Sequence, residues 1–436
     1  MKTMWEKTCQ LLAFILIVFS VVLGITTLAS AVEYEYTELL PPGAIGSSAS
    51  VINNSGAVVV VGDYDNGLNK LFIYSEGVYT ELPPLGWGLS EVSAINDIND
   101  SGAVVGEVYD GTTTAGFLYS EGVYTKMLPQ GWGLSEAHGI NNSGVVVGYG
   151  NDVYGTKNWF LYSAGQYTEL LPLGWTFSYP SDINNSGVVV GYGNDSTTAD
   201  FRGFIYSAGV YTELLPSGAV KSSANAINNS GAVVGEGNAE GASSKGFLYS
   251  AGVYTEIMPP GTVLSYAKDI NDSGAVVGAG AEEGASSKGF LYSAGVYTEI
   301  MPPGWVSTVA YGINNSGVVV GTGHDGTSDK GFIAIPITTP LEQMQSLIEF
   351  FDNGVADGSL SGNGLFSKLK LKRFRGMLLQ AQALIESGNT DGACQLLTKA
   401  YMRVDGNTLP RDYVMGSAAP NLAAKIDALI KSLNCS

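Results

Sequence analysis

Short apolar runs alternate with polar turn residues along most of this chain, in a unit that recurs seven times. The phrase Ile-Asn-Asn-Ser-Gly-Ala-Val-Val begins at Ile52, and near-copies begin at Ile98, Ile140, Ile183, Ile227, Ile270 and Ile313. The successive spacings are 46, 42, 43, 44, 43 and 43 residues. A fixed period of this length is typical of repeat architectures.

Each repeat contains four short segments rich in Val, Ile, Phe, Tyr and Thr, which favour strands. In the third repeat these segments are residues 137–141, 145–148, 160–162 and 167–170. Asn-Asn-Ser-Gly joins the first pair and Ser-Ala-Gly the second pair. Because Asn and Gly tolerate a left-handed backbone, both phrases predict tight hairpin turns. Four antiparallel strands per repeat predict an all-β fold, a seven-bladed β-propeller with four-stranded blades.

The order of the phrases predicts how the ring closes. Tyr-Thr-Glu-Leu occurs first at Tyr36, before any other repeat element, and the last repeat ends at Pro336 without such a segment. We therefore expect residues 36–39 to complete the blade that begins near Ile313. This joint would remove two exposed sheet edges, which otherwise invite aggregation. An open β-solenoid is the alternative, but it has no use for the complementary ends.

The repeats resemble the HAF repeats of extracellular bacterial proteins. The phrase Ala-x-x-Ile-Asn-x-x-Gly-x-Val-Val-Gly is kept at residues 224–235, whereas Lys-Gly-Phe-Leu at residues 245–248 stands where His-Ala-Phe-Leu would be expected. The resemblance covers roughly residues 36–336 and recurs in all seven units. It implies a secreted, propeller-like domain and brings no established catalytic residues.

The first 31 residues are predicted to be a signal peptide. Lys2 and Lys7 precede an apolar run from Leu11 to Leu23, and Ala-Ser-Ala ends the segment at residue 31. A membrane anchor is the alternative, but no basic stop-transfer flank follows the run. We therefore expect an exported protein without a membrane span after cleavage, located outside the cell or in the periplasm. The propeller would then occupy residues 32–338.

From residue 339 to residue 436 the apolar period becomes helical. Helices are expected from Pro340, over residues 365–385, over residues 390–404 and from Pro420. Gly-Ser-Leu-Ser-Gly-Asn-Gly at residues 358–364 and Gly-Ala-Cys at residues 392–394 lie between and within these helices. With them, this small all-α domain resembles the FIMAH domain found at the C-termini of secreted bacterial proteins. The resemblance carries no known catalytic residues.

Two cysteines remain after the loss of Cys9 with the signal peptide. They are Cys394 and Cys435, both in the helical domain. In an oxidising compartment such a pair is expected to form a disulfide, because two thiols without a nearby histidine make a poor zinc site.

The predicted propeller is strongly acidic, with 30 Asp and Glu against 9 Lys and Arg between residues 32 and 340. Such a surface repels nucleic acid and anionic membranes, so neither is an expected partner. Solubility explains the charge most simply.

Four tryptophans follow a glycine in the connections between repeats: Trp87, Trp132, Trp175 and Trp305. Strand alternation places these connections and the loops between the second and third strands at the same end of the ring. Since variable loops on a rigid scaffold often carry function, this end is the predicted binding face. The tryptophans could stack on a ligand, or they could fill the space between neighbouring blades.

The loops between the second and third strands are acidic. Candidate calcium ligands are Asp63, Asp65, Asp195, Glu236, Glu282 and Asp325. None has the spacing of an EF-hand, so solvated loop charge is the simpler interpretation. We expect no cofactor, with calcium as the one alternative.

A further column of residues varies while its neighbours stay constant. The residues two positions before each repeated isoleucine are Ser50, Asn96, His138, Ser181, Asn225, Lys268 and Tyr311. If the first strand is innermost, this column lines the central channel. His138, Lys268 and Tyr311 are its candidate ligand-binding members; a water-filled channel tolerant of any polar residue is the alternative.

These patterns favour a secreted, monomeric, non-enzymatic binding protein whose ligand is an extracellular glycan or protein. A catalytic set is not recognisable, because the two histidines, His138 and His324, lie in different repeats. A propeller lyase or hydrolase acting on polysaccharide is the alternative, and it would require carboxyl groups with shifted pKa at one end of the channel. A purely structural envelope protein is the third interpretation.

Overall fold

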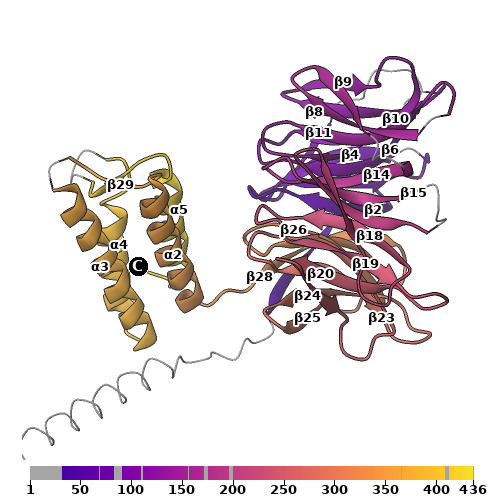
Figure 1. Ribbon diagram of the computed structural model, residues 1–436. Coiled ribbons are helices and arrows are strands. Elements are labelled where there is room, and N and C mark those ends of the chain that lie inside the picture. The colour runs from indigo at the N-terminus through magenta and orange to yellow at the C-terminus, as the bar shows by residue number, and fades with distance from the viewer. Residues whose placement is uncertain are drawn as a thin grey trace, which may run out of the picture. The chain divides into compact units, whose positions relative to one another are not determined.

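The computed structural model describes residues 32–67, 69–82, 91–109, 111–155, 157–170, 175–195, 200–364, 366–407 and 412–435. They form two compact units, the first ending at Pro336 and the second beginning at Ile337 (Figure 1). The predicted signal peptide, residues 1–31, lies outside the described residues. Among the helices that are described, none is both long and apolar enough to cross a membrane.

The first unit is a seven-bladed β-propeller of four-stranded antiparallel sheets, as the repeat pattern predicted. In six blades, four strands that are consecutive in the sequence lie side by side in order. Blades 1 to 3 are β2 (Gly46–Ile52), β3 (Val58–Asp63), β4 (Asn69–Ser75) and β5 (Val78–Glu81); β6 (Glu91–Ile98), β7 (Val104–Tyr109), β8 (Thr114–Ser120) and β9 (Val123–Met127); and β10 (Trp132–Ile140), β11 (Val146–Asp152), β12 (Lys157–Ser163) and β13 (Gln166–Leu170). Blades 4 to 6 are β14 (Trp175–Ile183), β15 (Val189–Asp195), β16 (Arg202–Ser207) and β17 (Val210–Leu214); β18 (Lys221–Ile227), β19 (Val233–Asn238), β20 (Lys245–Ser250) and β21 (Val253–Ile257); and β22 (Leu264–Ile270), β23 (Val276–Ala281), β24 (Lys288–Ser293) and β25 (Val296–Ile300).

Blade 7 joins the two ends of the propeller sequence. Its strands are β26 (Ser307–Ile313), β27 (Val319–His324), β28 (Asp329–Pro336) and, as the fourth, β1 (Tyr34–Leu39) from the start of the described chain. Tyr36 lies opposite Ala334 and Leu39 opposite Gly331 in this antiparallel pair. The predicted closure of the ring by residues 36–39 is therefore confirmed.

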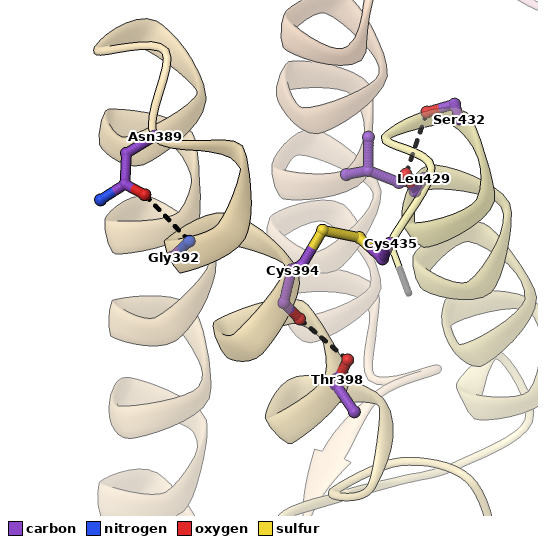
Figure 2. Close-up of a disulfide and its surroundings, with 7 residues drawn as sticks. All are labelled: Asn389, Gly392, Cys394, Thr398, Leu429, Ser432 and Cys435. Carbon is purple, nitrogen blue, oxygen red and sulfur yellow. Dashed lines mark hydrogen bonds between the residues drawn. A yellow bond between two sulfur atoms is a disulfide. The ribbon is translucent and has the colours of Figure 1, made fainter.

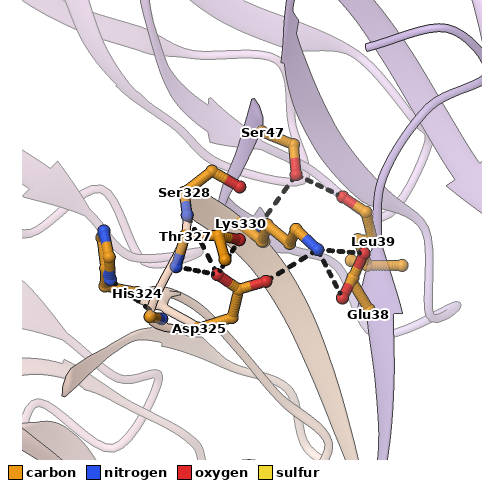
Figure 3. A network of polar contacts seen from close by, with 10 residues as sticks. Glu38, Leu39, Ser47, His324, Asp325, Thr327, Ser328 and Lys330 are labelled. Atoms are coloured by element: carbon orange, nitrogen blue, oxygen red, sulfur yellow. Dashed lines mark hydrogen bonds and ion pairs between the residues drawn. The ribbon is translucent and has the colours of Figure 1, made fainter. Parts of the chain in front are cut away.

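Polar side chains fasten the closing joint (Figure 3). The Ser47 hydroxyl donates to the Leu39 carbonyl at 2.6 Å and accepts from the Gly331 N–H at 3.0 Å. Lys330 on β28 pairs with Glu38 on β1 at 3.1 Å. The same double hydrogen bond by a buried hydroxyl ties other neighbouring blades together, at Ser135, Ser222, Ser265 and Thr308. The joint between the termini is thus built like the joints inside the chain.

A ring of asparagines links all seven blades at the hub. The first asparagine of each Asn-Asn-Ser-Gly turn, or of its variant, accepts backbone N–H groups of its own turn through Oδ1. Its Nδ2 donates to the carbonyl of the equivalent asparagine in the next blade, at 3.0 to 3.2 Å. The series runs through Asn53, Asn99, Asn141, Asn184, Asn228, Asn271 and Asn314 and returns to Asn53. One side chain therefore shapes the turn and closes the ring.

The second unit contains four described helices, α2 (Pro340–Asp357), α3 (Ser367–Glu386), α4 (Thr390–Tyr401) and α5 (Ala419–Ser432), with a short ladder of β29 (Ser361–Gly362) and β30 (Val414–Met415). Thr339 and Glu342 form a capping box at the start of α2, and Gly358 ends it with a left-handed backbone. Buried side chains from all four helices, among them Leu347, Phe374 and Ile426, form one core. The expected helical positions are confirmed to within a few residues.

Cys394 and Cys435 form a disulfide in this unit, as expected (Figure 2). It links α4 to the residue that follows α5 by three positions, across a sequence separation of 41. Replacement of Cys394 by Ser is expected to lower the free energy of unfolding of the helical unit by about 2–4 kcal/mol, because the unfolded chain regains the loop entropy that the bond removes. Chemical unfolding followed by helical circular dichroism would measure this loss, and reduced wild-type protein is the control. An unchanged helical transition would contradict the prediction.

Candidate functional site

Strand topology separates the two ends of the propeller. The short hairpin turns between the first and second and between the third and fourth strands all lie at one end. Connections of variable sequence, from the second to the third strand and from one blade to the next, lie at the other. We call the second end the variable face.

Three carboxylates line the middle of the central channel: Asp97, Asp182 and Asp269, each directly before a repeated isoleucine. In blades 2, 4 and 6, one carboxylate oxygen accepts the N–H of that isoleucine at 2.6 to 2.7 Å. The other oxygen accepts the isoleucine N–H of the next blade at 2.8 Å. In that next blade the residue before the isoleucine is small, as at Gly139 and Gly312. Each carboxylate therefore bridges two blades.

These carboxyl groups are partly buried in the wall of the channel. Burial, reinforced by the charge of Asp182, raises the pKa of Asp97 to about 8. Burial also raises the pKa of Asp269 to about 6 and shifts the pKa of Asp182 in the same direction. The two backbone hydrogen bonds on each carboxylate act against burial but do not cancel it.

On the variable side of these carboxylates the channel opens into a cavity of about 300 Å³. The structure places the whole variable column around it: Ser50, Asn96, His138, Ser181, Asn225, Lys268 and Tyr311. The ammonium group of Lys268 lies 5.1 Å from the centre of the Tyr266 ring. Tyr311 is 39% exposed, so it is accessible to a ligand. Whether these residues bind one stays a prediction.

An aromatic sector lies beside this cavity, between blades 3 and 4. We define it by five rings, Tyr149, Phe177, Tyr179, Tyr192 and Phe201, whose neighbouring centroids are 5.1 to 6.5 Å apart. The His138 ring packs on Tyr179 at 4.4 Å and connects the sector to the channel. All five rings are partly exposed, and Phe201 has 43% of its surface accessible.

Two glutamates adjoin the aromatic sector. Glu136 lies opposite Tyr149 in the β10–β11 ladder, and its Oε2 is 3.3 Å from Nε2 of His138. Burial and then the charge of Glu136 raise the pKa of Glu107 to about 7. The pKa of Tyr179 is raised by burial and then by the charge of Glu136. Carboxyl groups, an imidazole and phenol groups therefore share one region of the variable face.

The tryptophans predicted to bind ligand lie largely inside their blades. Trp132 is 6% exposed, packs edge-on against Phe160 at 5.7 Å and donates its indole N–H to Glu169 at 3.0 Å. Trp175 and Trp305 pack against the equivalent phenylalanines at 5.8 and 5.9 Å. Trp87 lies outside the described residues. Each of the three described indoles thus packs against a phenylalanine of its own blade, and ligand binding by the tryptophans stays a prediction.

The candidate calcium ligands are spread over the blades. No group of three or more His, Cys, Asp or Glu side chains suited to a metal ion occurs among the described residues. The Asp325 carboxylate forms a salt bridge with Lys330 at 2.9 Å and accepts hydrogen bonds from N–H groups of its own loop (Figure 3). These contacts hold the pKa of Asp325 below the usual range. Glu236 accepts a hydrogen bond from Asn225. Asp63 is the last residue of β3, and Asp65 lies two positions after it. Glu282 borders a cavity in blade 6. The side chain of Asp195 is outside the described part of the chain. Calcium binding stays a prediction.

Sequence reasoning missed both the channel carboxylates and the aromatic sector. The signal for the carboxylates is the residue before each isoleucine, which reads Val51, Asp97, Gly139, Asp182, Ala226, Asp269 and Gly312. The signal for the sector is the residue before the second glycine of β11 and β15, which is Tyr in both. The other blades have Val61, Glu107, Glu236, Ala279 and Thr322 at this position.

Comparison with known proteins shows the fold alone. No family model and no curated protein matches the chain. Among solved structures it is similar to a catalytically inactive virginiamycin B lyase from Staphylococcus aureus with quinupristin, at 18% identity, a TM-score of 0.46, and coverage of 70% of this chain and 100% of that one. It is also similar to a Mycobacterium tuberculosis puromycin-hydrolyzing peptidase, at 11% identity, a TM-score of 0.45, and coverage of 67% of this chain and 49% of that one. A Xanthomonas campestris gluconolactonase is similar at 12% identity, a TM-score of 0.36, and coverage of 71% of this chain and 99% of that one. Identities this low carry no functional assignment.

Proposed function

We propose that this protein is a secreted binding protein that holds an extracellular glycan on the variable face, beside the channel mouth. Partly exposed aromatic rings offer flat apolar surface to a sugar ring, while neighbouring carboxylates accept hydrogen bonds from its hydroxyl groups. The aromatic sector with Glu136 and His138 combines both features.

One observation carries this proposal: the repeats diverge where the sector lies. Tyr179 on β14 faces Tyr192 on β15, whereas the same cross-strand pair is Val309 and Thr322 in blade 7. In a chain that otherwise repeats its core residues closely, the additional rings are not needed to build a blade. Exposed aromatic clusters of this kind are typical of binding sites.

The test is glycan-array screening of the full mature chain, followed by titration of the best ligand. Tyr179→Ala is expected to weaken binding ten-fold or more, about 1.4 kcal/mol, because the central ring of the sector is lost. Tyr266→Ala is the matched control, since Tyr266 is the equivalent residue in blade 6. Thermal unfolding of both variants shows that they are folded. Equal loss of binding in both, or no glycan bound at all, would contradict the proposal.

Export of the chain and the identity of its two units are part of the same proposal. We infer that residues 1–31 are a cleaved signal peptide, that the blades are HAF-type repeats and that the helical unit is FIMAH-like. The disulfide is consistent with an oxidising compartment outside the cytoplasm. N-terminal sequencing of the exported protein would test the cleavage: a mature chain that still begins at Met1 would contradict it.

A second candidate function, cleavage of the bound polysaccharide, has one observation in its favour. The raised pKa of Glu107 suits a group that gives or takes a proton near neutral pH, and Glu136, whose charge acts on it, lies 3.3 Å from His138. Incubation with the glycan found on the array, followed by assay of new reducing ends and of unsaturated products, would distinguish the two functions. An intact glycan after prolonged incubation would leave binding as the function.

A further inference from the structure

Blades 5 and 6 each contain a cavity in the place that an indole ring fills in blades 3, 4 and 7. The cavity in blade 5 measures about 320 Å³ and that in blade 6 about 260 Å³. We propose that these two cavities are binding sites for a planar aromatic ligand with an N–H donor, of the size of an indole. This inference is independent of the proposed glycan site.

The tryptophan position lies at the end of the same backbone turn in each of these blades. The backbone N–H of Trp132 donates to the carbonyl of Pro129 at 3.1 Å, and the residue before Trp132 is a glycine with positive φ. Ala219 makes the equivalent bond to Pro216 at 3.0 Å, and Thr262 to Pro259 at 3.2 Å. The position is therefore unchanged, and only the side chain differs.

The walls of both cavities match the surroundings of the buried indoles. Trp132, Trp175 and Trp305 lie edge-on against a phenylalanine of the third strand. The equivalents, Phe247 in blade 5 and Phe290 in blade 6, line the open cavities.

A glycine of the second strand also borders each of these sites. A Cβ on Gly150 would lie 2.5 Å from the Trp132 ring, so the indole needs a glycine there. Gly237 and Gly280 stand at this position in blades 5 and 6, and both line the cavities. A Cβ on Gly237 would lie 3.4 Å from Ala219 Cβ and from Pro216 Cγ, and a Cβ on Gly280 would lie 3.1 Å from Thr262 Cγ2 and 3.4 Å from Pro259 Cγ. Small side chains and a proline ring therefore cover each glycine where blade 3 has the indole.

A glutamate that accepts an indole N–H in blade 3 has an equivalent at each cavity. In blade 3 the indole N–H donates to Glu169. Glu256 and Glu299 occupy the same position in the Tyr-Thr-Glu segments of blades 5 and 6 and line the cavities. Each pairs with a lysine, Lys245 at 3.0 Å and Lys288 at 2.9 Å, and its carboxylate retains lone pairs for a further donor.

Blade 1 also has no tryptophan at this position, and there another ring lies in the space. Ala44 occupies the tryptophan position, and a Cβ added to Gly62 would lie 3.4 Å from the Tyr64 ring. The Tyr64 hydroxyl donates to Pro42 and fastens the ring at this place. In blade 1 the Tyr64 ring thus lies where blades 3, 4 and 7 have an indole.

The experiment is titration of the full mature chain with indole, 1-methylindole and N-acetyltryptophanamide, followed by ligand-observed NMR and calorimetry. We expect indole to bind, and 1-methylindole to bind several-fold more weakly because it lacks the N–H. Binding of N-acetyltryptophanamide at least as tightly as indole would assign the sites to a tryptophan side chain of a partner. Binding of indole alone would assign them to a free small molecule.

The double variant Ala219→Trp/Thr262→Trp restores the residue found in the sibling blades and is expected to reduce indole binding at least ten-fold. Its thermal midpoint should not fall, because the new rings fill existing space. Val263→Trp is the control: it adds an indole at an exposed neighbouring position that does not line the cavity. If wild type binds none of the three compounds, or if the folded double variant binds indole as well as wild type, the proposal is overturned.

Discussion

Removal of residues 32–39 is expected to abolish the cooperative unfolding of the propeller and to make the protein associate as its concentration rises. Without β1, strand β28 presents an unpaired row of backbone N–H and C=O groups, which is a template for pairing with another chain. Phe332, now fully buried, would be uncovered at the same edge. Size-exclusion chromatography and thermal unfolding at several concentrations would measure both effects.

A point substitution makes the same test quantitative. Leu39→Ala is expected to lower the free energy of unfolding by about 2–5 kcal/mol, because Leu39 is fully buried in the joint. Leu214→Ala is the matched control, since Leu214 is the equivalent fully buried residue of blade 4 and accepts the same serine hydroxyl bond. We expect similar losses at the two positions. A negligible loss at Leu39 beside a large loss at Leu214 would contradict a closed ring in solution.

The stability of the propeller is expected to fall as the pH rises from about 4 to about 8. Asp97, Asp182 and Asp269 have a higher pKa in the folded protein than the ordinary value of 3.8. The folded state therefore retains protons that the unfolded state has already released, and unfolding releases protons in this range. Since stability decreases with pH wherever the folded state binds more protons, the contribution is fully present below pH 3.8 and is lost above the folded pKa of Asp97, about 8.

Urea unfolding of the full chain across this pH range would measure the slope. Asp97→Asn should flatten it, because one titrating group is removed. Near pH 4 the variant should be less stable than wild type by about 1–3 kcal/mol, since the amide nitrogen cannot accept one of the two backbone N–H groups now bound at 2.7 and 2.8 Å. This deficit should shrink as the pH rises, because only the wild type loses stability through ionisation of Asp97. Asp65→Asn, at an exposed loop position, is the control and should change neither quantity. Stability that rises between pH 5 and pH 8 in wild type would refute the explanation.

The closing of the ring was predictable from the number of segments at the two ends. The sequence has an additional Tyr-Thr-Glu-Leu segment before the first repeat and lacks one after the last repeat. Pairing of the two unpaired strand edges is the physical reason to join them. The blade strands were predictable for a similar reason, since short apolar runs between Asn-Asn-Ser-Gly and Ser-Ala-Gly turns are a local property. The helices of the second unit follow from local period and capping residues in the same way.

The candidate site was less accessible to such reasoning. The variable column is visible in the sequence because its residues are polar and irregular, and the structure brings all seven of its members to one cavity. The size of a tryptophan does not tell whether its ring faces a ligand or a phenylalanine of its own blade. Ala219 and Thr262, at the same turn, carry no sequence signal of the cavities that lie beside them.

The sequence by itself determined the number of blades, the strands within each blade, the joint between the ends and the change to helices after Pro336. These features depend on the order and period of residues along one chain. Only the tertiary structure decided that Asp97, Asp182 and Asp269 share one channel, that Tyr149 meets Tyr179 across two blades, and that two cavities replace two indoles. Such features depend on distances between residues that are about 30 positions or more apart, such as Tyr149 and Tyr179, and no local pattern specifies those distances.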